Sequence, residues 1–169
     1  MNATLAGWNK TDDVSALEAM MACCGAHRWA AAMIAHRPAE SVAELSELAD
    51  RVWSTMEETD WLEAFRCHPR IGNRKSVGGG TKSEAWSSKE QCAVEDAEER
   101  VLAELAEENA AYEKRYGFTF IVYATGKSAA EMLAILKRRL NSDRMTELRE
   151  AAEQQRRIMQ IRLGKWLVE

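Results

Sequence analysis

The segment Phe118–Ala124 is the one part of the sequence with the run of aromatic and β-branched residues that is typical of a β-strand. A single strand has no partner to satisfy its backbone N–H and C=O groups, so a sheet is not expected. The segment is therefore either an extended connection that crosses the core or a place where a ligand takes the backbone hydrogen bonds.

Elsewhere the sequence has helical patterns. Apolar residues recur every three or four positions after capping residues such as Asp12, and both Ser41 and Ser128 begin a Ser-x-x-Glu capping box. Only two prolines occur in 169 residues, which leaves little material for the turns of a β protein. We predict an all-α, single-domain multi-helix bundle over residues 1–169. The expected helices cover about 13–24, 27–36, 42–56, 60–66, 88–116, 129–140 and 143–166.

The last expected helix places a charged side chain on its buried face. Its apolar line has spacings of three and four residues and includes Arg162. A buried guanidinium without a partner costs several kcal/mol, so this residue must pair either with a glutamate or with a ligand. The whole line is Leu148, Ala152, Gln155, Met159, Arg162 and Trp166.

A long stretch without periodicity begins at His68 and ends at Ser87. Because His68 precedes Pro69, its backbone is disfavoured in the helical region, and a turn displays the imidazole. A loop of this length in a compact chain is usually functional or disordered. Ser87, Glu90 and Gln91 share one face of the helix that follows. We expect an active site built on the imidazole of His68 at one edge of this loop and the carboxylate of Glu90 at the other.

Each of these residues also has a structural interpretation. His68 could simply hydrogen-bond the loop, although its ordinary pKa near neutrality favours acid–base chemistry. Ser87-x-x-Glu90 is itself a capping box, and Ser88-x-x-Gln91 is a second one. No His-x-x-x-His or His-Glu-x-x-His spacing occurs, so a metal site is not expected.

The net charge of −4 disfavours a nucleic-acid partner, because no basic surplus can neutralise phosphates. No apolar run approaches the roughly 20 residues of a membrane span. The N-terminal residues lack the basic and apolar regions of a secretory signal, and the four cysteines show no Cys-x-x-Cys spacing. We therefore expect a cytoplasmic protein without membrane contact.

Two segments together resemble the signatures of the OHCU decarboxylase family: Phe65-Arg66-Cys67-His68-Pro69-Arg70-Ile71-Gly72, and Ser87-x-x-Glu90-Gln91. Tyr116–Val122 and Ile161-Arg162-Leu163 also look like that family, and the resemblance runs from about the first helix to Leu163. Cys67 replaces the usual small residue, and Asn73-Arg74-Lys75 replaces a more acidic continuation.

The resemblance implies a helical, often dimeric enzyme. It would convert 2-oxo-4-hydroxy-4-carboxy-5-ureidoimidazoline (OHCU) into (S)-allantoin in urate breakdown without a cofactor. It also implies that His68 is the catalytic acid/base and that Glu90 lies beside it. The substrate would be lined by Pro69, Ser87, Ser88, Lys89, Glu90, Gln91, Phe120, Ile121, Val122, Tyr123, Ala124 and Arg162.

Two other functions stay open at this point. One is a decarboxylase or lyase for a related ureido or heterocyclic acid, which the same residue types would serve. The other is a non-enzymatic helical interaction module, in which His68 and Glu90 would be individually dispensable.

Overall fold

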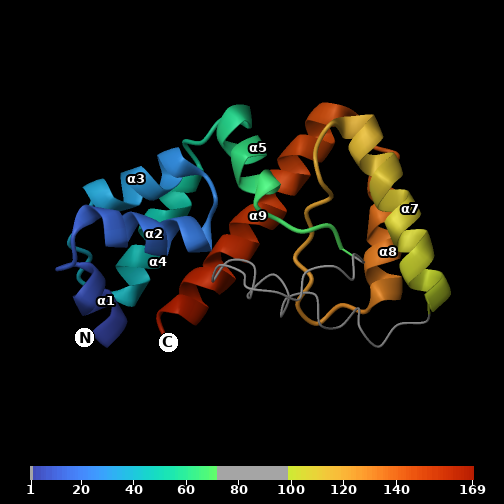
Figure 1. Cartoon of the computed structure of the whole chain (residues 1–169). Coiled ribbons are helices and arrows are strands. Elements are labelled where there is room, and N and C mark those ends of the chain that lie inside the picture. The colour runs from blue at the N-terminus through green and yellow to red at the C-terminus, as the bar shows by residue number, and fades with distance from the viewer. Residues whose placement is uncertain (1, 72–98) are drawn as a thin grey trace. The chain divides into compact units, whose positions relative to one another are not determined.

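The computed structural model describes residues 2–71 and 99–169, and all regular secondary structure in these ranges is helical (Figure 1). Phe118–Ala124 forms no strand and runs as an extended connection. The predicted all-α class is confirmed. The helices of the described ranges are α1 (Ala3–Trp8), α2 (Asp13–Cys23), α3 (His27–Ala35), α4 (Val42–Trp53), α5 (Glu58–Arg66), α7 (Glu99–Tyr116), α8 (Ala129–Arg139) and α9 (Arg144–Trp166).

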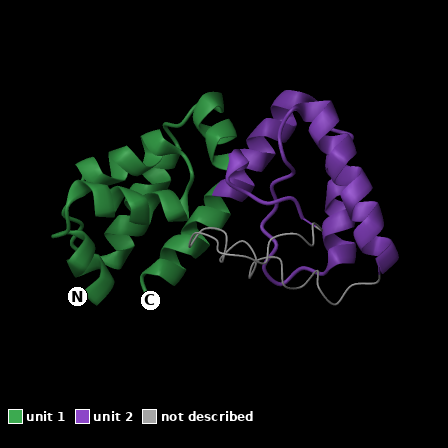
Figure 2. Ribbon diagram, in the orientation of Figure 1, with its two compact units in different colours: residues 1–64, 156–169 green, residues 65–155 purple. Residues whose placement is uncertain are grey.

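The chain divides into two compact units (Figure 2). Unit 1 comprises Met1–Ala64 and Arg156–Glu169, and unit 2 comprises Phe65–Gln155. Helix α9 supplies its first half to unit 2 and its second half to unit 1. Each unit has its own buried side chains.

Unit 1 is built from helices that bury one face each. Helix α2 packs against α3, and α3 packs against α4. Trp29 is fully buried, and its indole N–H donates to the carbonyl of Ala49 at 3.1 Å. The other fully buried large side chains of these helices are Met20, Met33 and Leu45.

Helix α1 was not predicted from the sequence. It has six residues, and a helix this short is unstable in isolation, so periodicity gives little signal. Its contacts within unit 1 hold it in place: the Asn2 side chain accepts from the amide of Leu5 at 3.0 Å and donates to the carbonyl of Leu167 at 2.8 Å. Trp8 packs edge-on against Trp166, with 6.1 Å between ring centroids.

Unit 2 packs α7 against α8 and encloses the extended connection (Figure 1). Helix α7 is followed by Gly117, whose φ of +82° is the left-handed conformation that favours glycine. The chain then turns back so that Phe118 and Phe120 contact Tyr112, with ring centroids 5.7 and 5.3 Å apart. An aromatic cluster therefore anchors the connection to α7.

The predicted N-caps of α2, α4 and α8 are confirmed, although Glu44 accepts from the amide of Glu40 and so does not complete the predicted capping box of Ser41. Asp12, Ser41 and Ser128 each accept a backbone N–H three residues on, and Ser128 forms a complete capping box with Glu131. Helix α5 begins at Glu58, slightly before the predicted start. The predicted start of α7 near Ser87 or Ser88 lies outside the described residues.

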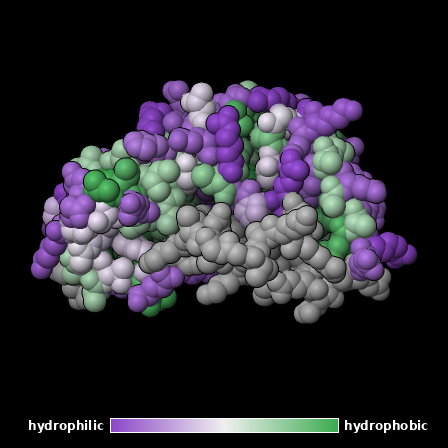
Figure 3. All heavy atoms as spheres, in the orientation of Figure 1, coloured by the Kyte–Doolittle hydropathy of each residue, from purple (hydrophilic) through white to green (hydrophobic). Residues whose placement is uncertain are grey.

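The face drawn in Figure 3 is mainly hydrophilic over the described residues, with hydrophobic side chains in small groups. None of the helices in the described ranges combines the length and apolar character needed to cross a bilayer. In the same ranges, no three His, Cys, Asp or Glu side chains are grouped as a metal site would require.

Candidate active site

His68 lies in the turn that follows α5, as its position before Pro69 predicts. Its amide N–H donates to the carbonyl of Phe65 at 3.1 Å, which closes the turn. Phe65 is 1% exposed and packs against Phe118 with 5.5 Å between ring centroids. The ring contact ties the end of α5 to the extended connection, and the imidazole is left half-buried.

A glutamine of α9 contacts the imidazole. The distance from His68 Nε2 to Gln155 Oε1 is 2.6 Å, and Gln155 is fully buried. The spacing of apolar residues predicts that Gln155 lies on the buried face of its helix, but it predicts no functional role for this residue. A long polar side chain on an apolar stripe was the available signal, because such a group is buried only with a hydrogen-bond partner.

Some backbone groups of the extended connection are hydrogen-bonded by α9 and by Lys127, in the turn that follows the connection. The amide of Tyr123 donates to Gln154 Oε1 at 2.9 Å, and the Tyr123 carbonyl accepts from Lys127 Nζ at 2.8 Å. The Ala124 carbonyl accepts from the Lys127 amide at 3.0 Å. The structure thus contains the first of the two predicted alternatives, an extended connection through the core. A ligand-binding role remains a proposal for Phe120–Ala124, in which the backbone of Val122, for example, hydrogen-bonds to no other described residue.

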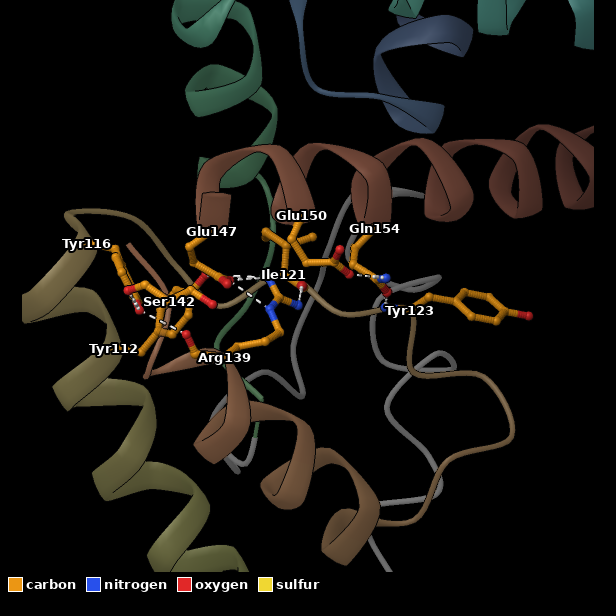
Figure 4. Close-up of polar contacts among 9 residues, drawn as sticks. All are labelled: Tyr112, Tyr116, Ile121, Tyr123, Arg139, Ser142, Glu147, Glu150 and Gln154. Carbon is orange, nitrogen blue, oxygen red and sulfur yellow. Dashed lines mark hydrogen bonds and ion pairs between the residues drawn. The ribbon is translucent and has the colours of Figure 1, made fainter. Parts of the chain in front are cut away.

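A buried ionic cluster holds the middle of this connection (Figure 4). Arg139, 4% exposed, donates through Nη1 to the Ile121 carbonyl at 2.6 Å and through Nε to Glu147 Oε1 at 2.7 Å. The hydroxyl of Tyr112 donates to the same carboxylate oxygen. The Arg139 guanidinium also lies 4.8 Å from the ring centroid of Phe120.

Tyr112 is held in its protonated form. Burial raises the pKa of Tyr112 well above its ordinary value of 10.0, and the contact with Glu147 raises it further, against the opposing charge of Arg139. The Tyr112 hydroxyl therefore keeps its proton and donates a hydrogen bond to Glu147. The cluster comes from α7, α8 and α9, and it fixes one carbonyl of the connection.

Arg162 is 1% exposed, which confirms its predicted inward position on α9. It belongs to unit 1, whereas His68, Pro69 and Phe120–Ala124 belong to unit 2. The unit 2 residues are linked through consecutive glutamines, because Gln155 contacts His68 and Gln154 contacts Tyr123. The remaining predicted site residues, Ser87, Ser88, Lys89, Glu90 and Gln91, lie outside the described residues.

Comparisons with known proteins point to one family. A family model described as OHCU decarboxylase matches residues 9–164. The uric acid degradation bifunctional protein TTL of Arabidopsis thaliana is 38% identical over 144 residues, which are 85% of this chain and 44% of that protein. This chain therefore spans less than half the length of that relative.

A second relative is matched over almost its whole length. The 2-oxo-4-hydroxy-4-carboxy-5-ureidoimidazoline decarboxylase of Haloferax volcanii is 26% identical over 163 residues, 96% of this chain and 95% of that protein. A crystal structure of OHCU decarboxylase in the presence of (S)-allantoin has a TM-score of 0.77 and 33% identity, and the match covers 94% of this chain and 100% of that chain. Since the family model covers nearly the whole sequence, this chain belongs to the OHCU decarboxylase family.

Proposed function

We propose that this chain decarboxylates OHCU to (S)-allantoin, a step of urate breakdown. The observation that carries the proposal is the family match over residues 9–164, which includes His68 in its turn before Pro69. The similar crystal structure, which was determined in the presence of (S)-allantoin, supports the same substrate class.

The substrate supplies its own electron sink. When the bond between C4 and the carboxylate breaks, its electron pair forms a C4=C5 double bond and the C5=N electrons move onto nitrogen. CO₂ leaves and the ring nitrogen takes up a proton. The enol at C4 then loses its hydroxyl proton and becomes a ketone as C5 takes a proton on one face. This route requires no cofactor electron sink of the kind that pyridoxal phosphate supplies. The protein must orient the carboxylate, exclude water and control the face of protonation.

His68 is the proposed acid/base for that proton, with Glu90 beside it. A carboxylate next to an imidazole favours the charged ring, so Glu90 would keep His68 protonated when a proton must be delivered. A bidentate donor such as Arg162 suits the carbonyl or carboxylate oxygens of the substrate. The remaining proposed substrate contacts are Pro69, Ser87, Ser88, Lys89, Gln91 and Phe120–Ala124.

We also propose that residues 1–169 form one OHCU decarboxylase domain, that the protein is a homodimer and that it works in the cytoplasm. The family model covers both compact units, and α9 runs through both, which supports the first point. Analytical ultracentrifugation of the purified chain tests the second, because a monomer at micromolar concentration would refute it.

The function is tested with substrate that is generated from urate in the assay mixture. Urate is treated with urate oxidase and hydroxyisourate hydrolase, and circular dichroism follows optically active allantoin with and without this chain. We expect the chain to accelerate formation of the (S) enantiomer. A rate equal to that without the chain would refute the proposal. Turnover of a related ureido acid with no effect on OHCU would instead support the alternative lyase.

A further inference from the structure

Gln155 is the polar side chain most completely enclosed beside His68. It is 0% exposed, and its Oε1 lies 2.6 Å from Nε2 of the imidazole. Burying an amide costs free energy unless its polar atoms are paired, so the contact contributes to the stability of both side chains. The two residues are 87 positions apart, and both belong to unit 2.

We propose that Gln155 is a positioning residue that holds His68 with its proton on Nε2. An amide oxygen is an acceptor only, so the ring nitrogen that faces it must carry hydrogen. With Nε2–H held in this way, the neutral ring has its lone pair on Nδ1, and Nδ1 is the atom that gains and loses a proton. This inference rests on the proposed function, in which His68 acts as acid/base.

The neighbouring glutamine extends the arrangement to the backbone of the site. Gln154 Oε1 accepts from the Tyr123 amide at 2.9 Å, and its Nε2 donates to Glu150 Oε1 at 2.9 Å (Figure 4). Consecutive residues of one helix thus orient the imidazole and the extended connection. Because a helix is rigid over two residues, the position of the ring relative to the connection is set by α9.

The tautomer can be measured directly in the wild-type chain. The sequence has three histidines, so the His68 ring signals can be assigned in a nitrogen-15 NMR spectrum by their loss in His68→Asn. At alkaline pH we expect a pyrrole-type signal for Nε2 of His68 and a pyridine-type signal for Nδ1. The opposite assignment would overturn the proposal. The spectrum needs no turnover, so it stays informative even if the chain fails to decarboxylate OHCU.

Two variants test the catalytic consequence. Gln155→Leu removes the acceptor at similar size. We expect kcat to fall about 10- to 100-fold, the scale known for loss of a partner that orients a metal-bound histidine, with a smaller change in KM. Gln155→Glu puts a carboxylate at the same place, which favours the imidazolium, so the pH dependence of kcat should move to higher pH.

Gln160→Leu is the matched control, because Gln160 is also a hydrogen-bonded glutamine of α9 but bonds Ser46 and Asp50 in unit 1. It should leave the pH profile of kcat unchanged. If both Gln155 variants kept the wild-type kcat and its pH profile, Gln155 would be only a structural residue. If Gln155→Leu failed to fold, Gln155→Glu and the wild-type spectrum would still decide between the two outcomes.

Discussion

Arg139 and Glu147 form a buried ion pair between the end of α8 and the start of α9. Their side chains are 5% and 1% exposed, and Arg139 Nε lies 2.7 Å from Glu147 Oε1. The same guanidinium donates to the Ile121 carbonyl, so the pair connects two helices to the extended connection.

Removing one partner of the pair should destabilise unit 2 strongly. Among the described residues, Glu147→Gln leaves Arg139 without its carboxylate partner at a buried site. We expect a loss of about 3–5 kcal/mol in the free energy of unfolding, the usual range for breaking a buried pair. Urea unfolding followed by circular dichroism measures it. Glu104→Gln is the control, because its pair with Lys137 is nearly half exposed, and its loss should be much smaller. Equal losses in the two variants would contradict this account of the buried pair.

The raised pKa of Tyr112 predicts that the folded state loses stability at alkaline pH. Its pKa is raised in the fold, so above the ordinary value of 10.0 the folded state holds a proton that the unfolded state releases. The stabilisation is complete below that pH and is lost as the pH rises above it. Tyr112→Phe should therefore show a weaker fall in melting temperature between about pH 9 and pH 11. Parallel curves for the two proteins would contradict the prediction.

His68→Asn should lower kcat by roughly 100-fold or more, the scale for loss of a general acid/base. The fold should be kept, since His68 is half-buried in a turn whose backbone hydrogen bond the variant retains. The coupled urate assay measures the rate. His27→Asn, at the exposed start of α3, is the control and should turn over normally. Normal turnover by the His68 variant would remove this residue from the mechanism.

Glu90→Gln separates the catalytic and capping interpretations of Glu90. A capping box accepts either residue at its third position, so the change in stability should stay below about 1 kcal/mol. Loss of the negative charge should lower kcat by about one to several orders of magnitude. Melting and turnover are measured on the same preparation. A variant with both values unchanged would leave His68 to act without Glu90.

Arg162→Lys tests whether the buried guanidinium binds the substrate. Lysine keeps the charge but lacks the planar fork, so we expect a folded protein with KM raised at least several-fold. Saturation curves in the urate assay measure this value, and thermal melting verifies the fold. An unchanged KM would assign Arg162 to structure alone.

The sequence alone was sufficient for the fold class and for the described helices other than the six-residue α1. Local signals determine these features: Asp12, Ser41 and Ser128 cap the helices that follow them, and Gly117 ends α7. The spacing along α9 also correctly predicted that Arg162 is buried, because helical periodicity reports which residues share a face.

Only the tertiary structure decided which groups pair. The sequence allowed the whole backbone of Phe120–Ala124 to bind a ligand. In the structure, Arg139 hydrogen-bonds the Ile121 carbonyl from 18 positions away, and Gln154 hydrogen-bonds the Tyr123 amide from 31 positions away. Gln155, which contacts the His68 imidazole, is 87 positions away from it. Periodicity reports the face on which a side chain lies, but it contains no distance between helices. Hydrogen bonds need atoms within about 3 Å of one another, and only the packed chain provides that proximity.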